Sequence, residues 1–335
     1  MYDVVNLTPF QTAGAALIDV TGEHVWVVIV KGTFRVVDGE VDLADGQEPV
    51  AHRPDYRGAP GASSLRSDSE LCPSHPGTDV TIDGLAHAPG GRAATTVDVS
   101  VRVGALGRHV RVHGDRVWTH RLGMVTASET ARFVDMPVTY ERAFGGRAHA
   151  AGKGDVPYPA NPVGVGYYVD PPVDGSPLPN VEDPRHPIRS WKDRPCPAGV
   201  GPIERGWSPR VALAGTYDEH WQMHRAPLWP ADVNPRFFSC ASPGLYSEAP
   251  LRGGEPVVVE NMTPDGRWTF TLPMFVVYVR TMLRGRPQHS RAQLDRIHLL
   301  PEDQRVVLTW RAVARCGDST RKVSRSTVWA YKITR

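Results

Sequence analysis

Alternating hydrophobic and polar residues predict β-strands in the first part of the chain. In Thr95–Val103, valine occupies every second position from 97 onward, while Asp98, Ser100 and Arg102 fall on the opposite face of an extended segment. The segment Arg108–Trp118 shows the same period of two. Each pattern is typical of a strand with one buried face and one solvated face.

Other segments rich in β-branched and aromatic residues predict further strands. In chain order they are Val25–Val37 with a break at Lys31-Gly32, Asp79–Ala86, Phe133–Tyr140, Glu255–Asn261, Arg267–Leu272, Phe275–Thr281, Arg305–Ala314 and Thr327–Ile333. The dipeptide Asp265-Gly266 predicts a hairpin between two of these strands. Helices are expected to be few and short, at Asp218–Arg225 and at Gln288–Ile297.

The composition of the chain changes after Tyr140. The segment Glu141–Pro209 contains 13 prolines, which interrupt sheet and helix alike. A disordered linker would be polar and poor in aromatic residues. This segment instead carries aromatic residues with much apolar area to bury, among them Tyr158, Tyr167, Tyr168, Trp191 and Trp207. We therefore expect an ordered, irregular layer that packs on the β-core.

Together these elements predict an all-β protein. We expect a β-sandwich or barrel-like core of mostly antiparallel strands, with a long Pro/Gly-rich irregular central layer and few short helices. Three regions are distinguished: an N-terminal β region at 1–140, the irregular segment at 141–250, and a C-terminal β region at 251–335. We expect the three regions to fold as one cooperative unit.

Composition and charge narrow the class of protein. Hydrophobic residues make up 41% and charged residues 22%, as in an ordinary globular protein, and the net charge of +2 gives no electrostatic reason to expect a nucleic acid or membrane partner. Met1–Gln11 has no secretory pattern, and the longest aliphatic runs are too short to cross a bilayer. We therefore predict a cytoplasmic protein. Its four scattered cysteines, with no C-x-x-C pair, predict reduced thiols and no zinc site.

Sequence motifs of the common enzyme classes are missing. The chain contains no nucleophile elbow, Walker loop, dinucleotide fingerprint or H-E-x-x-H motif. His220 and His224 would share one face of a helix, but no third metal ligand follows from their spacing. His109, His113 and His120 are expected on a solvated face. We predict a protein that is not an enzyme, with no catalytic residue, metal or cofactor.

Acidic residues in the most aromatic region leave a second possibility open. A pair of carboxylates could support glycoside hydrolysis, and the candidates are Glu204, Asp218, Glu219 and Asp232. The plainer interpretation is that these acids pair with neighbouring arginines, namely Arg205, Arg210, Arg225 and Arg236. An acid held by arginine keeps a low pKa and is a poor general acid.

Several long sequence blocks carry a resemblance to a known family. They are Y-E-R-A-F-G-G at Tyr140–Gly146, N-P-V-G-V-G at Asn161–Gly166, L-P-N-V-E-D-P at Leu178–Pro184, Pro197–Arg210, Ala214–Asp232, R-F-F at Arg236–Phe238 and, more weakly, Arg252–Gly266. With these blocks the chain, from Asp3 to about Leu272, resembles domain-of-unknown-function family 2169. The segment Ala241–Ala249 is less diagnostic, and the pentapeptide repeats fused to some relatives are not found here.

The resemblance implies an adaptor or chaperone of type VI secretion. Such a protein would bind a PAAR-containing effector, keep it soluble and help load it onto the VgrG spike. The family offers no catalytic residues to carry over. A carbohydrate-active β-fold enzyme or a sugar-binding module, using the acids near Glu204 and Asp218, is the alternative.

Aromatic residues and arginines of the central region are the candidate partner-binding surface, because Trp, Tyr and Arg dominate interface hot spots. The residues are Trp191, Trp207, Arg210, Tyr217, Asp218, Trp221, Arg225, Trp229, Arg236 and Phe237. Prolines would stiffen this surface before binding. The alternative for each aromatic residue is a place in the core. A second binding mode is strand addition at an edge formed by Val257–Val259.

Overall fold

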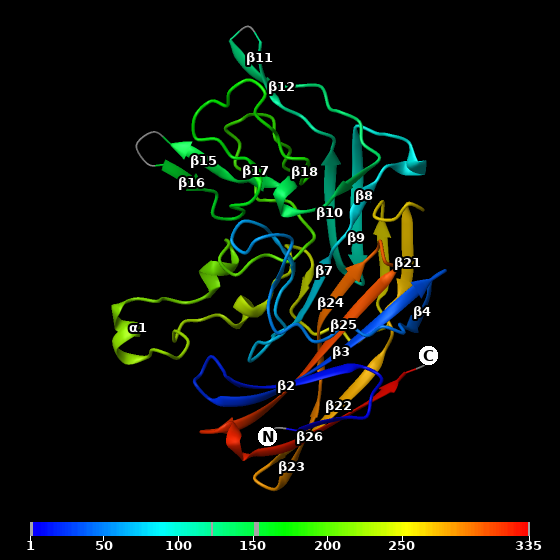
Figure 1. Ribbon diagram of the computed structural model, residues 1–335, viewed down its shortest axis with the longest axis vertical. Coiled ribbons are helices and arrows are strands. Elements are labelled where there is room, and N and C mark those ends of the chain that lie inside the picture. Colours follow the sequence, from blue (N-terminus) through cyan, green and yellow to red (C-terminus); the bar gives the residue numbers. More distant parts are fainter. Residues whose placement is uncertain (1–2, 122, 151–153, 334–335) are drawn as a thin grey trace.

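The computed structural model describes residues 3–121, 123–150 and 154–333. Three larger sheets, within these residues, hold most of the strands (Figure 1). The seven-stranded sheet has the order β19 (Tyr246–Ser247), β7 (Thr78–Ile82), β24 (Gln293–Leu300), β25 (Arg305–Gly317), β3 (His24–Val37) and β2 (Gln11–Ile18), with β4 (Glu40–Leu43) also paired to β3. The prediction of an all-β protein is confirmed.

Two further sheets pack on the first. The four-stranded sheet has the order β1 (Asp3–Asn6), β26 (Val323–Lys332), β22 (Phe275–Leu283) and β23 (Arg286–Arg291). The five-stranded sheet has the order β18 (Val181–Glu182), β10 (Leu106–His113), β9 (Thr96–Val103), β20 (Pro256–Glu260) and β21 (Arg267–Thr271). Most neighbouring strands are antiparallel, and β1–β26 and β7–β24 are parallel pairs.

Short elements fill the connections. The two-stranded pairs are β5 (Asp55–Tyr56) with β6 (Leu65–Ser67), β8 (Leu85–His87) with β13 (Asp135–Pro137), β11 (Trp118–Arg121) with β12 (Met124–Ala127), β14 (Phe144–Gly145) with β17 (Val165–Gly166), and β15 (Arg147–Ala150) with β16 (Gly154–Pro157). The α-helix α1 spans Glu219–His224, and the 3-10 turns are Pro89–Gly91, Tyr140–Arg142, Arg210–Leu213, Pro235–Phe238 and Thr320–Lys322. No helix in the described ranges is long and apolar enough to cross a membrane.

The alternating pattern that predicted β9 corresponds to its burial. Its valines are buried and Asp98 and Arg102 are exposed, so one face packs inward and the other meets solvent. The hairpin predicted at Asp265-Gly266 is also confirmed, since β20 and β21 are antiparallel around it. The helix predicted at Asp218–Arg225 is confirmed as α1.

Two predictions about local structure are wrong. The strand β3 continues through Gly32 without a break, because the missing side chain leaves space for the rings of Phe10 and Phe34, about 3 Å from where a Cβ would stand. The helix predicted at Gln288–Ile297 is replaced by parts of β23 and β24, because β24 gains hydrogen-bonded neighbours on both sides, in β7 and β25. Tertiary pairing outweighs the local pattern here.

Other predicted strands are shorter than expected. The segment Asp79–Ala86 is divided between β7 and β8 by Asp83 and Gly84, which belong to no strand, and Arg108–Trp118 is divided between β10 and β11. Of Phe133–Tyr140, the three residues of β13 form a strand and Phe133 forms an isolated bridge with Ala94.

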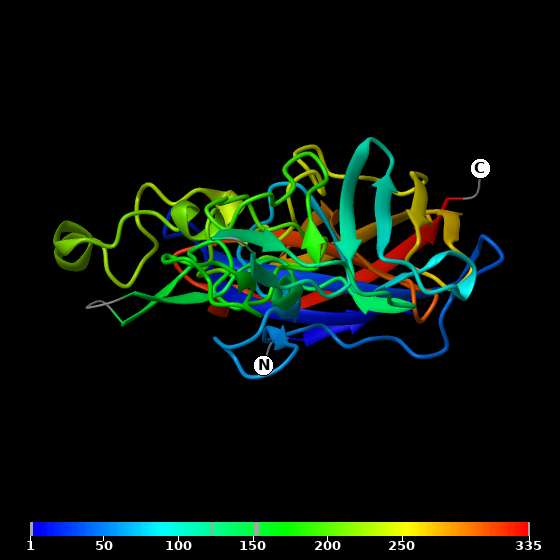
Figure 2. The ribbon, with the colours of Figure 1, turned by 90° about the horizontal axis from the view of Figure 1, so that it is seen from above.

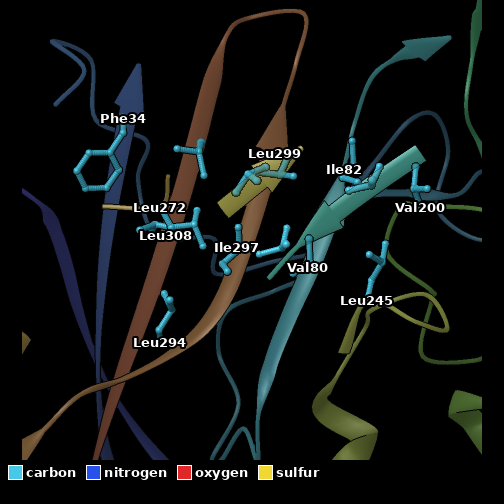
Figure 3. Close-up of a cluster of buried hydrophobic side chains, with 14 of the residues drawn as sticks. Phe34, Val80, Ile82, Val200, Leu245, Leu272, Leu294, Ile297, Leu299 and Leu308 are labelled. Carbon is cyan, nitrogen blue, oxygen red and sulfur yellow. The ribbon is translucent and has the colours of Figure 1, made fainter. Parts of the chain in front are cut away.

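The core lies between the sheets and is shared by all three regions of the sequence. One cluster of buried side chains includes Val99, Val200 and Leu299, one residue from each region. Figure 3 shows part of this cluster, where Ile82, Ile297 and neighbouring side chains from β7, β24, β25 and β3 meet. This continuity is the basis for expecting cooperative unfolding, which stays a prediction. The cysteines are free thiols, with Cys196 exposed and the other three buried.

Candidate functional site: a buried ionic layer and a projecting arm

One face of the seven-stranded sheet is apolar, and the other carries polar and charged side chains beside a small apolar cluster of Val25, Val27 and Ile29. Its apolar face, with Val80, Ile297 and Leu308, forms the core. On the opposite face, strand register places charged and polar side chains in a row across four strands. The row runs Lys31 on β3, Thr309 on β25, Arg296 on β24 and Asp79 on β7.

Loops cover this polar face and bury its charges. We use the name ionic layer for the buried charged residues between the sheet and these loops, which are Lys31, Asp68, Glu70, His75, Asp79, Arg210, Asp295, Arg296 and Arg311. Buried charges of this kind are stable only when paired and hydrogen-bonded. Arg311, for example, donates Nε to Asp295 Oδ2 at 2.6 Å and its remaining nitrogens to the carbonyls of Cys72 and Glu70.

The pair Asp68–Arg210 joins the central segment to the layer. Arg210 Nη2 lies 2.6 Å from Asp68 Oδ2, and both side chains are almost fully buried. The guanidinium also donates to the carbonyls of Ile203 and Phe237 at 2.7 and 2.8 Å, so all three nitrogens are used. Burial alone would raise the pKa of Asp68, but the charges of Arg210, Arg205 and Arg296 hold this pKa below its usual value.

A second buried pair holds the residues that follow the 3-10 turn Pro235–Phe238. His75 Nε2 lies 3.2 Å from Asp79 Oδ2, and the same carboxylate accepts hydrogen bonds from Ser239 Oγ and the backbone N–H of Cys240. Although burial opposes both charges, the facing carboxylate raises the pKa of His75 and the facing imidazole lowers the pKa of Asp79. The two residues thus form a hydrogen-bonded pair that anchors Ser239 and Cys240.

A polar cavity of about 280 Å³ lies at one end of the ionic layer. It is lined by Lys31, Glu48, Glu70 and His298, among others. Lys31 Nζ stands 3.6 Å from Glu48 and 3.4 Å from Glu70. Burial, aided by the charges of Lys31 and Arg296, lowers the pKa of His298 to about 4, so this imidazole is neutral at pH 7. No cluster of three or more His, Cys, Asp or Glu side chains suited to a metal ion occurs among the described residues.

The segment 211–232, which we call the arm, projects away from the sheets. Figures 1 and 2 both show α1 at the far end of this projection. Asp218 caps the helix by accepting a hydrogen bond from the backbone N–H of Trp221 at 2.8 Å. Asp232 accepts from the backbone and hydroxyl of Thr216 at 2.9 and 2.7 Å, which closes the arm at its base.

The arm is fastened to the end of β2 and to the loop that follows it. Arg225 Nη2 donates to the carbonyl of Val20 at 3.0 Å, and Trp229 Nε1 donates to the carbonyl of Ile18 at 3.3 Å. Trp229 also packs on Phe237 and Phe238, which belong to a small buried cluster. The base of the arm is therefore fixed, while its far end has few neighbours.

Apolar side chains are exposed on the arm. Tyr217 is 52% exposed and Met223 is 67% exposed. Tyr217 rests against Trp221, with ring centroids 4.7 Å apart. The imidazoles of His220 and His224 stack at 4.6 Å, and His224 Nδ1 lies 3.0 Å from the carbonyl of His220, so this nitrogen already has a partner.

The ten predicted partner-binding residues divide into three groups. Trp207, Arg210 and Phe237 are buried and hold the central segment in place. The arm unites five others, with Tyr217 and Asp218 exposed and Trp221, Arg225 and Trp229 half-buried. Outside the arm, Trp191 is half-buried and Arg236 is exposed, with its guanidinium 4.3 Å from the centre of the Tyr246 ring.

The candidate acids of the central region do not face one another across a cleft. Glu204 accepts a hydrogen bond from the backbone N–H of Gly206, while Asp218 and Asp232 hold the arm. Their predicted pairing with nearby arginines is wrong. Arg205 and Arg210 approach Asp68 instead, which lies far back in the sequence, and Arg225 donates to backbone carbonyls.

The other candidate histidines lie away from the ionic layer. His109 is half exposed on the outer face of the five-stranded sheet, as expected, and lies 3.4 Å from Asp98. His113 is more enclosed, and burial with the nearby Arg116 lowers its pKa to about 4. His120 lies on β11, where its Nε2 is 2.7 Å from the carbonyl of Pro172.

The residues that sequence reasoning missed are those of the ionic layer other than Arg210. Asp79 and Arg296 stand next to β-branched and aliphatic residues, in T-D-V-T-I and R-I-H-L-L. A charge in such a run indicates a buried and paired group. That signal was available in the sequence, but the identity of each partner was not.

Comparisons with known proteins give one match. A family model described as an uncharacterized protein conserved in bacteria (DUF2169) matches residues 21–311. The match therefore begins later and ends later than the span expected from the sequence blocks. Neither the curated proteins nor the solved structures give a match.

Proposed function

This chain belongs to the DUF2169 family of proteins conserved in bacteria, and from that premise we propose that it is an adaptor or chaperone for a type VI secretion effector. It binds a PAAR-containing effector and helps load it onto the VgrG spike. The arm is the observation that carries the proposal, because it holds exposed apolar side chains on a firmly attached base.

Physical reasons favour the arm as a protein-binding surface. Exposed aromatic and methionine side chains gain free energy when a partner removes them from water. The hydrogen bonds of Asp218, Asp232 and Arg225 fix the backbone in advance, so little conformational freedom is lost on binding. An apolar residue exposed on a rigid projection can enter a pocket on another protein.

The lowered pKa values of Asp68 and Asp79 support a structural role for the ionic layer. Where the pKa of a carboxyl group departs from its ordinary value, in the described part of the chain, it is lowered, as for Asp183 at about 2. General acid catalysis needs a carboxyl group with a raised pKa. The candidate acids Glu204, Asp218 and Asp232 accept hydrogen bonds from nearby backbone N–H groups and do not face one another across a cleft, which favours the adaptor over the carbohydrate-active enzyme.

Effector binding by alanine variants tests the proposal. We expect Tyr217→Ala combined with Met223→Ala to weaken binding of the PAAR-containing effector at least tenfold, about 1.4 kcal/mol. Val173→Ala is the matched control, because Val173 is 74% exposed but lies outside the arm. Kd values from calorimetry and melting curves for each variant are the measurements.

Two results would count against this function. Equal affinity of the arm variant and the wild type would remove the arm as the binding surface. No binding of the effector by the wild-type protein would contradict the adaptor itself. In that case sugar binding on a glycan array, followed by a turnover assay, would test the sugar-binding module and the enzyme.

A further inference from the structure

The strand β2 forms an end of the seven-stranded sheet (Figure 1), and no strand is hydrogen-bonded to its outer edge, although β1 packs against one of its faces where Val4 lies beside Gly14. It pairs only with β3, in an uninterrupted register from Gln11↔Lys31 to Ile18↔His24. Its sequence Q-T-A-G-A-A-L-I contains no charge and no proline. Natural sheets usually protect an edge with charged residues, proline or a bulge, and β2 has none of these.

The hydrogen bonds of β3 show which backbone groups of β2 point outward. In an antiparallel sheet, alternate residues of a central strand bond to opposite neighbours. The N–H of Val36 donates to the carbonyl of Gln304, which lies on the side of β3 that pairs with β25. The carbonyl of Thr33 accepts from the N–H of Ala44, which directly follows β4 and lies on the side of β3 that pairs with β2. Odd-numbered residues of β3 therefore bond to β2.

The register then assigns the groups of β2. Its odd-numbered residues are opposite odd-numbered residues of β3 and bond to them. Its even-numbered residues direct N–H and C=O outward, and these are Thr12, Gly14, Ala16 and Ile18. The hydrogen bond from Trp229 of the arm to the carbonyl of Ile18 agrees with this assignment. The backbone groups of the other three have no hydrogen bond to any described residue.

Other exposed edges are better protected. The edge strand β23 carries Arg286, Pro287 and Arg291. The edge strand β19 has two residues, and β1 has four. The edge strand β21 carries the charge of Arg267. The previously expected edge at Val257–Val259 is wrong, because β20 pairs with β9 and with β21.

We propose that the edge of β2 receives an extended segment of the partner protein as an added strand. The N–H and C=O groups of Thr12, Gly14 and Ala16 would pair with those of the incoming segment. Because the edge is uncharged and small side chains line both faces, the segment that fits has β-branched or aromatic residues and neither charge nor proline. The partner is the effector of the proposed function, on which this inference rests, since the arm meets this edge at Ile18.

Residue-resolved amide hydrogen exchange gives a specific signature. In the free protein, the outward amides of Thr12, Gly14 and Ala16 should exchange much faster than the inward amides of Ala13 and Ala15. Addition of the PAAR-containing effector should slow exchange at the three outward amides at least tenfold and leave the two inward amides unchanged. Protection without this alternation would overturn the proposal, because a partner covering a face of the strand would protect both sets.

Two substitutions at one position separate backbone pairing from side-chain contact. Ala16→Pro removes an outward N–H that β3 does not use, so the strand should stay paired. Ala16→Val introduces a side chain similar in size to that of proline but keeps the backbone N–H. We expect the proline variant to bind the effector at least tenfold more weakly and the valine variant to bind like the wild type, with similar melting temperatures for both.

The outcomes distinguish this inference from the proposed function. If the wild type binds the effector but the outward amides stay unprotected, edge pairing is overturned while the adaptor function stands. If the wild type does not bind the effector, the adaptor function fails and the inference fails with it. Alternating protection that appears without effector, as the protein concentration rises, would show a second copy on the edge and would overturn the proposal.

Discussion

Replacing Arg210 by alanine removes the cation that faces Asp68 in the ionic layer. Asp68 keeps its hydrogen bond from the backbone N–H of Ser69 and a longer contact with Arg205 at 3.6 Å, but it loses the 2.6 Å ion pair. The carbonyls of Ile203 and Phe237 also lose their donor. A buried charge without its partner is strongly unfavourable.

The expected loss is about 3–5 kcal/mol of unfolding free energy, the range found when one partner of a buried ion pair is removed. This estimate applies because both side chains are almost fully buried, so solvent does not screen the pair. Removing the charge of Asp68 as well should recover part of the loss. We therefore expect Arg210→Ala to cost at least about 2 kcal/mol less in an Asp68→Asn background than in the wild type.

Urea unfolding of the four proteins in this cycle, followed by tryptophan fluorescence and circular dichroism, measures these free energies. A further expectation concerns pH. Because the folded-state pKa of Asp68 is lowered, its contribution is present above the unfolded pKa near 3.8 and is lost as pH falls through the folded value. A loss below about 1 kcal/mol in Arg210→Ala, or additive effects in the double variant, would refute this account of the ionic layer.

Three other predictions concern separate features. The stabilisation from His75, measured against His75→Asn by urea unfolding, should be full below its unfolded pKa near 6.5 and should decline as pH rises through its raised folded pKa; a constant difference across pH would contradict the charged pair. Gly32→Ala should cost about 1–3 kcal/mol because the new Cβ would stand 2.9 Å from Phe10, whereas Gly46→Ala, with open space around it, should change stability by less than about 0.5 kcal/mol; equal unfolding midpoints would show that the site is not tightly packed. Asp218→Ala should lower the stability of α1 by about 1 kcal/mol and make the amide of Trp221 exchange faster, because that amide loses its hydrogen-bond acceptor. Unchanged exchange at Trp221 would show that the cap does not stabilise the helix.

Much of the fold follows from short-range pattern. Alternation in β9 predicts which side of the strand is buried. The aromatic content of the central segment predicts that it is ordered, because burying so much apolar surface is favourable. The helix predicted at Asp218–Arg225 is present as α1, and Asp218 caps its first turn. These features depend on neighbours along the chain, and the sequence displays such neighbours directly.

The ionic layer depends on neighbours that are far apart along the chain. Asp68 and Arg210 are 142 positions apart, and Thr309 donates to Glu70 across 239. Nothing local identifies these partners, so pairing with the nearest opposite charge was the reasonable and mistaken expectation. The strand β24 shows the same effect, because its two flanking strands decide its conformation.

The two unlike faces of the seven-stranded sheet also restrict how its strands can assemble. A slip of β24 by one position would turn Arg296 and His298 toward the apolar interior and bring Ile297 and Leu299 among the carboxylates. Neither side of the sheet tolerates that exchange, since one side would receive an unpaired charge and the other would lose its counter-ions. A shifted pairing of β24 is therefore unfavourable on both faces of the sheet, and both faces favour the correct register.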